Sequence, residues 1–406
     1  MRTLIVFSHL RWDFVFQRPQ HLLSRLAREY RVLFIEEPVQ GMRSSYLERL
    51  APCENVEVLR PRVTGALPGF DDSHFEEVGD LLTQYLDDFS ISDYAVWFYT
   101  PMAWPLLAWL HPNAVIYDCM DELSAFLNAP PQLIERERKL LARADVVFTG
   151  GPSLYEAKRR MSGNVHCVPS AVDGKHFAQM SCTVSEKVAA LIDHVPGPQL
   201  GFFGVIDERL DIALLTALAD ARPEWKFMLV GPVVKIHLTD LPMRPNLHWL
   251  GQQSYETLPQ FMQKWDVCLL PFALNDSTRF ISPTKTLEYM AAGKPIVSSP
   301  IRDVVLLYGD SVHIAQGVQA FVDACEACLH EAQAATQRRR LLMHDHVNRA
   351  TWDGAARLIQ REVEHAVASQ SRNGEPRAAT GRNVRPAGVA PSSVQPLHAG
   401  AMVAGQ

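Results

Sequence analysis

The sequence predicts an α/β protein made of two Rossmann-like domains with parallel sheets, and three observations support this prediction. Short apolar runs of strand length recur along the 406 residues, and a stretch with helical spacing of apolar residues follows most of them. A variable stretch with proline and glycine interrupts this alternation at 171–198. Between Asp266 and Ser299 a strand, a loop, a capped helix and a second strand form one unit of a parallel sheet. We therefore expect a first domain at 1–170, a linker at 171–198 and a second domain at 199–350.

The first domain is predicted to begin with the strand TLIVFS at 3–8, whose continuous apolar run is typical of a buried parallel strand. Pro19 starts the helix that follows. Mixed charges at 135–139 indicate a solvated helix face. Further strands are expected at 32–35, 55–59, 95–99, 114–117, 145–149 and 165–168, and helices at 74–88, at 104–109, around 135–139 and from a cap at Ser153 to Arg160.

The loop at 9–18 is unusual, because it carries three aromatic residues and two arginines that are costly to expose without a use. At the carboxyl end of a parallel strand such residues are placed to bind a ligand, with arginine making bidentate contacts and tryptophan stacking on a sugar face. We expect Arg11, Trp12 and Arg18 to form an acceptor-binding or phosphate-binding surface. The alternative is a loop that packs under a neighbouring helix. Acidic residues at 118–122, among them Asp121, also follow a strand and should reach the same edge.

The second domain is predicted from three strands that each end in glycine, at 200–204, 226–231 and 246–251. The next helix begins at Tyr255. Later elements are expected as a strand at 266–271, a strand at 295–299, a strand at 312–315, helices to about residue 348, and an amphipathic helix at 352–368. Residues 370–406 are rich in Gly, Ala, Pro, Ser and Arg without apolar periodicity, which predicts a disordered tail.

The capped helix of the second domain carries the groups best suited to a phosphate. Ser282 is a suitable N-cap, Pro283 suits the first helical position, and Gly293 suits a left-handed C-terminal cap. The amides of Thr284 and Lys285, together with the lysine charge, would then meet a phosphate at the carboxyl edge of the sheet. Glu288 shares their helix face and could accept hydrogen bonds from ribose hydroxyls. The alternative is that Lys285 and Glu288 pair with each other.

Composition excludes several classes of protein. Hydrophobic content of 47%, charged content of 21% and a net charge of −6 fit a globular protein and argue against general nucleic-acid binding. The seven cysteines form no disulfide framework, and Cys325 and Cys328 are expected to be core residues of a helix. No run of about 18 apolar residues occurs. These features predict a cytoplasmic protein, with peripheral contact to the inner face of the membrane left open.

The segment Glu288-Tyr-Met-Ala-Ala-Gly293-Lys-Pro-Ile-Val297 resembles the nucleotide-sugar-binding segment of glycosyltransferases with the two-domain B fold. It is most similar to the large family that includes bacterial mannosyl- and glucosyltransferases of lipid and polysaccharide assembly. In that family a second glutamate stands eight residues before the one that matches Glu288. Here Phe280 occupies that position, and Ser282-Pro-Thr-Lys285 replaces the usual glycine-rich turn. The donor sugar and the choice between retaining and inverting chemistry therefore stay open.

The resemblance implies two facing domains, a cleft between them, and a helix at 352–368 that crosses back to the first domain. It implies a nucleotide-diphosphate sugar as donor, a glycan or lipid-linked acceptor, no cofactor and no metal. A carboxylate follows the matching strand in some members, so Asp121 is the first candidate base; His9 is the second, and a helix N-cap is the structural alternative for Asp121. Arg209 stands where the family carries basic residues that hold the diphosphate. The expected donor-binding residues are Gly204, Arg209, Ser282, Thr284, Lys285 and Glu288.

Two other classes of function are open at this point. A sugar-nucleotide hydrolase or epimerase on the same fold would use similar phosphate-binding groups. A degenerate, non-catalytic transferase-like binding module would keep the fold alone, and the loss of a glutamate at Phe280 favours it, whereas intact Lys285 and Glu288 argue against it. A flavin or nicotinamide enzyme is disfavoured, because no GxGxxG follows the first strand.

Overall fold

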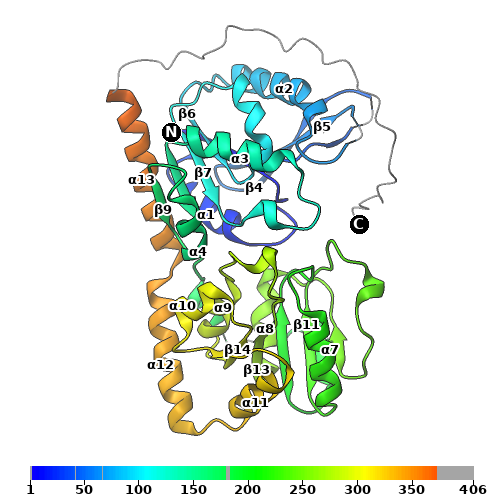
Figure 1. Ribbon diagram of the computed structural model, residues 1–406. Helices are drawn as coiled ribbons and strands as arrows, with labels where there is room; N and C mark the ends of the chain where they lie inside the picture. Colours follow the sequence, from blue (N-terminus) through cyan, green and yellow to red (C-terminus); the bar gives the residue numbers. More distant parts are fainter. Residues whose placement is uncertain (1, 42, 66, 180–182, 373–406) are drawn as a thin grey trace.

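A computed structural model describes residues 2–41, 43–65, 67–179 and 183–372 of the protein. The chain forms two α/β domains, and its C-terminal helices run along one side of both (Figure 1). Each domain is built on a predominantly parallel sheet, which confirms the predicted fold class.

The first domain contains a nine-stranded sheet in the order β3-β5-β2-β1-β6-β7-β8-β9, with β4 paired to β5. Every pair is parallel except β4 with β5. The central strand is β1, in which all six residues are buried and Thr3 aligns with Arg31 of β2 and Tyr94 of β6. The strands are β1 (Thr3–Ser8), β2 (Arg31–Glu36), β3 (Val39–Gln40), β4 (Tyr46–Cys53), β5 (Val56–Val63), β6 (Tyr94–Phe98), β7 (Val115–Cys119), β8 (Val146–Thr149) and β9 (Val165–Cys167).

Helices of the first domain lie close to their predicted positions. They are α1 (Arg18–Leu26), α2 (Phe75–Asp88), α3 (Gln132–Arg143) and α4 (Pro152–Lys158), with 3-10 helices at Asp72–His74, Pro101–Trp109 and Leu123–Ala125. Two expectations are wrong. Ser153 does not cap α4, because Gly151 is the N-cap and Ser153 is bonded to Asp303 instead. The charged face of α3 is not wholly solvated, since Arg136 and Glu137 are buried.

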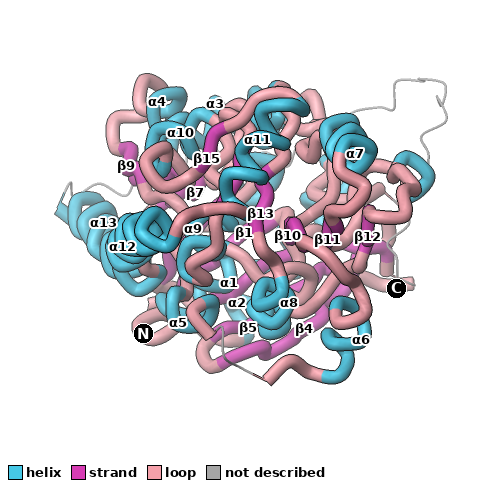
Figure 2. Tube along the Cα trace, turned by 90° about the horizontal axis from the view of Figure 1, so that it is seen from below, coloured by secondary structure: helices cyan, strands magenta, loops and turns pink. Residues whose placement is uncertain are grey.

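The second domain contains a six-stranded parallel sheet in the order β12-β11-β10-β13-β14-β15. Figure 2 shows β10, β11 and β12 between α7 and α11 on one side and α8 on the other. The strands are β10 (Gln199–Phe203), β11 (Lys226–Val230), β12 (Leu247–Trp249), β13 (Val267–Leu270), β14 (Ile296–Ser298) and β15 (His313–Ile314). The helices are α7 (Ile212–Ala221), α8 (Leu258–Lys264), α9 (Lys285–Ala291), α10 (Arg302–Tyr308) and α11 (Val318–Leu329), with 3-10 helices at Leu238–Asp240, Tyr255–Thr257 and Asp276–Thr278.

The segment predicted as a linker packs on the second domain. It contains α5 (Gly174–Phe177) and α6 (Glu186–Ile192). Phe177, Val188 and Ile192 are fully buried in the core of that domain. Cys325 and Cys328 are buried in the same core, as expected.

The C-terminal helices connect the two domains. α12 (Gln333–Arg349) lies beside the second domain and α13 (Trp352–Arg372) beside the first (Figure 1). His21 of α1 stacks on Trp352 with 4.7 Å between ring centroids, which ties α13 to the first domain. The predicted crossover helix is therefore confirmed and continues to Arg372 instead of ending at 368. Of the tail predicted at 370–406, residues 373–406 lie outside the described residues.

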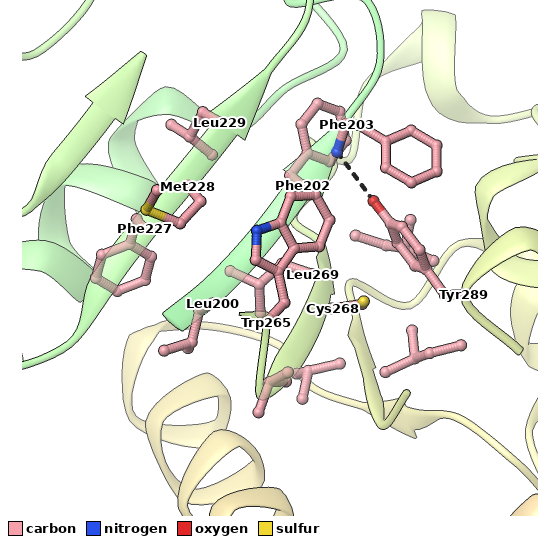
Figure 3. Packing of buried hydrophobic residues seen from close by; sticks show 14 of the residues in the cluster. Leu200, Phe202, Phe203, Phe227, Met228, Leu229, Trp265, Cys268, Leu269 and Tyr289 are labelled. Atoms are coloured by element: carbon pink, nitrogen blue, oxygen red, sulfur yellow. Dashed lines mark hydrogen bonds between the residues drawn. The ribbon is translucent and has the colours of Figure 1, made fainter. Parts of the chain in front are cut away.

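The core of the second domain fixes α9 against the end of β10. Trp265, Phe203 and Tyr289 pack around this strand (Figure 3). The Tyr289 hydroxyl accepts a hydrogen bond from the Phe203 amide at 3.1 Å. A Cβ on Gly201 would overlap the Trp265 ring, so a glycine is needed in the strand at this point. Because Tyr289 directly follows Glu288, this packing also positions the polar face of α9.

Candidate active site

A cleft of about 550 Å³ lies between the two domains and is lined by loops at the carboxyl ends of both sheets. Ligands of open α/β sheets bind at this edge. The first domain contributes residues 12–18 and 120–121 together with His21 and Ser170. The second domain contributes residues 203–205, 230–232, 252–256 and 281–285, together with Arg209, Leu258, Phe272 and Glu288.

Two glycines allow backbone and side-chain atoms to pack closely in the second-domain wall of the cleft. Gly204 and Gly231 follow β10 and β11 with φ of 145° and 150°, which side chains rarely adopt. A Cβ on Gly231 would overlap the carbonyl oxygen of Gly204, and a Cβ on Gly204 would overlap Cε of Lys285. The glycine at 204 therefore leaves room for Lys285 to extend along the floor of the cleft, where its Nζ lies 5.6 Å from the Phe202 ring centroid.

Lys285 and Glu288 both line the cleft, and no ion pair or hydrogen bond joins their side chains in the described structure. Burial and then the charge of Arg209 lower the pKa of Lys285, while Glu288, Asp207 and Asp121 oppose this shift. Burial raises the pKa of Glu288 to about 7 against the opposing charge of Lys285. The structure therefore does not support the alternative in which the two side chains only pair with each other. Each has unused capacity to bind a ligand.

The loop before α9 differs from the predicted cap. The helix begins at Lys285 and its N-cap is Thr284, so Ser282 does not cap it and Pro283 lies before the first turn. The amides of Thr286 and Leu287 bond to the carbonyls of Pro283 and Thr284. No described partner accepts from the amides of Thr284 or Lys285. The prediction of Gly293 as a left-handed cap is confirmed by its φ of 67°, with bonds from Gly293 N to Met290 O and from Lys294 N to Tyr289 O.

Arg209 lies in the cleft, but its charge is shared. Its Nε and Nη2 atoms donate to the carboxylate of Asp207 at 2.6–3.0 Å. Its guanidinium also lies over the ring of Phe126, with 5.2 Å from Cζ to the ring centroid. Phe126 belongs to the first domain, so Arg209 links the two walls of the cleft.

The loop that carries Asp121 reaches across to the second domain. Lys235 also lies over the ring of Phe126, with 4.3 Å between its Nζ and the ring centroid. The amide of Leu127 donates to Glu208 Oε1 at 3.1 Å. Asp121 itself lines the cleft, and within the described residues its side chain makes no hydrogen bond that would identify it as a helix cap. Burial raises the pKa of Asp121, with Arg209 opposing, Asp207 adding to the rise, and Lys235 and Lys285 opposing.

Residues 197–331 match the family Glycosyl transferases group 1. The match covers most of the second domain. The putative teichuronic acid biosynthesis glycosyltransferase TuaH of Bacillus subtilis is 25% identical over 252 residues, which cover 57% of this chain and 62% of TuaH. The chain is thus homologous to a glycosyltransferase and matches about three fifths of the length of that relative.

Solved structures show the same fold at low identity. Sucrose-phosphate synthase of Thermosynechococcus elongatus has a TM-score of 0.70 at 14% identity, covering 91% of this chain and 100% of that chain. An Escherichia coli trehalose-6-phosphate structure bound with UDP-2-fluoro glucose has a TM-score of 0.68 at 14% identity, covering 90% and 99%. Anabaena HepE in complex with UDP and glucose has a TM-score of 0.64 at 14% identity, covering 90% and 100%. These matches confirm the two-domain glycosyltransferase B fold.

Within the matched segment, Phe280 is not among the residues that line the cleft. The Phe280 side chain is partly buried and packs against the core of the first domain. Arg279 lies over its ring, with 5.2 Å between Cζ and the ring centroid. The position at which the family carries a glutamate is used here for apolar contact between the domains. Replacement of a carboxylate by phenylalanine thus has a structural reason.

The first-domain wall departs most from expectation. His9 and Arg11 are not among the residues that line the cleft. The His9 side chain lies outside the cleft, and burial together with the charge of Lys235 lowers its pKa to about 4. Arg11 donates to Glu36 Oε2 at 3.0 Å and to the carbonyl of Glu37 at 2.7 Å. Arg18 lines the cleft, yet its guanidinium is 3% exposed and bonded to Asp118 and to the carbonyl of Val168.

An aromatic cluster at the open side of the cleft was not predicted as a unit. Trp12 lines the cleft but also packs against Phe34, with a centroid distance of 5.1 Å. Phe16 lies 4.9 Å from Tyr255 of the second domain, and Tyr255 stacks on His176 at 4.4 Å. Tyr255 has a buried hydroxyl without a described partner. Its only signal in the sequence is its place after a strand that ends in glycine, which does not distinguish a ligand-binding residue from a helix start.

Proposed function

We propose that this protein transfers a sugar from a nucleotide-diphosphate sugar to a hydroxyl of a glycan or lipid-linked acceptor. The observation that carries the proposal is Lys285, which lines the cleft. Among the residues that the structure describes, its side chain has no ion-pair partner, and nothing accepts a hydrogen bond from the amides of Thr284 and Lys285. The match of residues 197–331 to group 1 glycosyl transferases and the presence of UDP ligands in two of the similar structures support it.

The donor diphosphate is proposed to bind between Lys285, Arg209 and the amides of Thr284 and Lys285. A leaving diphosphate gains negative charge as the glycosidic bond breaks, and fixed positive groups at that point stabilise the transition state. Two cations and two amides supply this stabilisation in the proposal without a metal ion. Glu288 lies one turn into α9 and is placed to accept hydrogen bonds from the ribose.

Asp121 is proposed to take the proton of the acceptor hydroxyl if the reaction inverts the anomeric carbon. It lies on the first-domain wall of the cleft, and its raised pKa makes it a stronger base than an exposed aspartate. His9 is the weaker candidate, because its pKa near 4 and its place outside the cleft lining both act against it.

TuaH is described as a putative enzyme of teichuronic acid biosynthesis, and we propose a related role for this chain in polysaccharide or glycolipid assembly. None of the helices within the described ranges is long and apolar enough to cross a membrane. Action in the cytoplasm, with peripheral contact at the inner face of the membrane, is part of the proposal.

Calorimetry and thermal shift with a nucleotide panel test the donor site. UDP, GDP, ADP and their glucose or mannose conjugates would be added to the full chain, because a ligand at 100 times its Kd stabilises by about 2.7 kcal/mol. We expect one diphosphate to bind, Lys285→Ala to weaken it, and Lys187→Ala, at an exposed position on α6, to leave it unchanged. Absence of binding by every nucleotide would contradict the proposal. Consumption of the sugar conjugate without any acceptor would indicate a hydrolase or epimerase instead.

A further inference from the structure

We infer that the acceptor end of the cleft takes an uncharged sugar ring, stacked on aromatic side chains, and not a sugar phosphate. This inference rests on the proposed transferase function and names the acceptor class of the same site. Three features around the first-domain loop 12–18 carry it: a cation that is already neutralised, carboxylates that line the cleft, and exposed aromatic rings.

The cations come first. Arg18 is the one lysine or arginine that the first domain contributes to the described cleft lining. Its Nε and Nη2 atoms bond to Asp118 at 2.9–3.2 Å, and its Nη1 atom donates to the Val168 carbonyl at 2.9 Å. Both side chains of this pair are almost fully buried, at 3% and 0% exposed. The arginine therefore offers neither net charge nor accessible donors to a phosphate.

Carboxylates line the part of the cleft where a phosphate on the acceptor would need cations. Asp13 of the first domain and Glu256 of the second both line the cleft. The Asp13 side chain is 65% exposed and lies 3.5 Å from Nη2 of Arg60, whose charge Glu36 and Glu48 also share. Asp121 lines the cleft from the first domain. The cations of the opposite wall, Lys285 and Arg209, are assigned to the donor diphosphate. A phosphate on the acceptor would therefore meet like charges, which repel it at short range.

The rings supply the favourable contact. Phe14 and Phe16 are 41% and 42% exposed, although phenylalanine is usually buried. They are held in place, because Gln252 of the second domain donates to the Phe14 carbonyl at 2.6 Å and Phe16 packs on Tyr255 and on His21. The apolar face of a neutral sugar fits such rings. The neutral side chains of Gln253 and Ser254 also line the cleft and can form hydrogen bonds with the sugar hydroxyls.

The test compares neutral and phosphorylated sugars as ligands. Methyl α-glucoside, methyl α-mannoside, glucose 6-phosphate and mannose 6-phosphate would be titrated by saturation-transfer NMR, with and without saturating UDP. At least one neutral glycoside should bind, and the phosphorylated sugars should bind at least tenfold more weakly. A phosphorylated sugar that binds as tightly as its neutral counterpart, or no binding by either glycoside, would overturn the inference. UDP binding is measured separately, and its absence would count against the donor site alone.

A charge-reversal variant tests the electrostatic cause. Asp13→Lys/Glu256→Lys should gain about tenfold in affinity for glucose 6-phosphate, and 0.5 M salt should remove most of the gain. The matched control is Asp323→Lys, an exposed charge reversal on α11, which should gain nothing. Loss of methyl glucoside binding in Phe16→Ser, with UDP affinity kept, would support the stacking. The inference would be overturned if the double charge-reversal protein and Phe16→Ser both kept the wild-type ratio of affinities for methyl glucoside and glucose 6-phosphate.

Discussion

The two walls of the cleft differ in how available their cations are to a ligand. Within the described residues Lys285, on the second-domain wall, makes no ion pair, and burial lowers its pKa. Arg209 on the same wall is paired with Asp207. On the first-domain side Arg11 and Arg18 are each bound to a carboxylate, and neither is available to a ligand. A cation in a cleft is thus stronger evidence for anion binding when the surrounding structure leaves it unpaired, as it leaves Lys285, than when a carboxylate already binds it.

The largest effect is expected at Asp121, which lines the cleft from the first domain and interacts electrostatically with Arg209 and Lys285. Asp121→Asn keeps the shape of the side chain and removes its basicity, so turnover should fall by roughly 10²–10⁴-fold. Donor affinity should change little. The measurement is transfer rate and UDP affinity on the same preparation. Normal turnover in the variant would show that Asp121 is structural, and a mechanism without an enzymic base would replace it.

Paired alanine substitutions on the two walls test the comparison directly. Arg18→Ala leaves Asp118 buried and unpaired, which should cost about 3–5 kcal/mol in the free energy of unfolding. Lys285→Ala breaks no ion pair and should leave unfolding unchanged or slightly improved, while UDP affinity falls by about tenfold or more. Denaturant unfolding gives the free energy of unfolding of each variant, and calorimetry gives the UDP affinity of each. If Arg18→Ala proves stable and Lys285→Ala unstable, the assignment of the two cations is reversed.

Sequence patterns predicted the buried parts of this fold well. The strand at 3–8 is apolar throughout and lies at the centre of its sheet, so local pattern and burial agree there. β4 was missed because it is an antiparallel edge strand whose residues are mostly exposed, including the charged Arg49. Such a strand has no apolar pattern to detect. Its pairing depends on β5, which the sequence alone does not place beside it.

The second-domain half of the site was easier to predict than the first-domain half for a physical reason. Lys285 and Glu288 lie three residues apart on one helix, so local spacing already places them together, and Gly204 follows a strand that the apolar pattern predicts. Whether Arg18 is available to a ligand depends on its ion pair with Asp118, a hundred residues later in the chain. No local pattern records that pairing. The shifted start of α9 has a similar cause, since Ser282 lies against Gly151 of the other domain.

Gly151 offers a way to disturb the fit between the walls without touching a charged group of the site. A Cβ here would overlap Asp303 and approach the Ser282 Cβ to 2.7 Å, and both belong to the second domain. Because Ser282 leads into the Lys285 loop, Gly151→Ala should displace that loop and lower transfer about tenfold. Gly163→Ala is the matched control, since nothing lies within 4 Å of its Cβ. Equal transfer rates in the two variants would show that this contact does not set the cleft geometry.

The smallest effect concerns pH and Glu288. Burial raises its pKa to about 7, so the carboxyl is mostly protonated at pH 6 and mostly ionised at pH 8. An ionised carboxylate accepts stronger hydrogen bonds from ribose hydroxyls than a protonated one, so uridine affinity should rise about fivefold from pH 6 to pH 8. Uridine is the right probe, because it has no phosphate to respond to titration of Lys285. Glu288→Gln should bind uridine with a flat profile over the same range. If the wild-type profile is flat, or the variant shows the same rise, Glu288 does not contact the ribose and its raised pKa reflects burial alone.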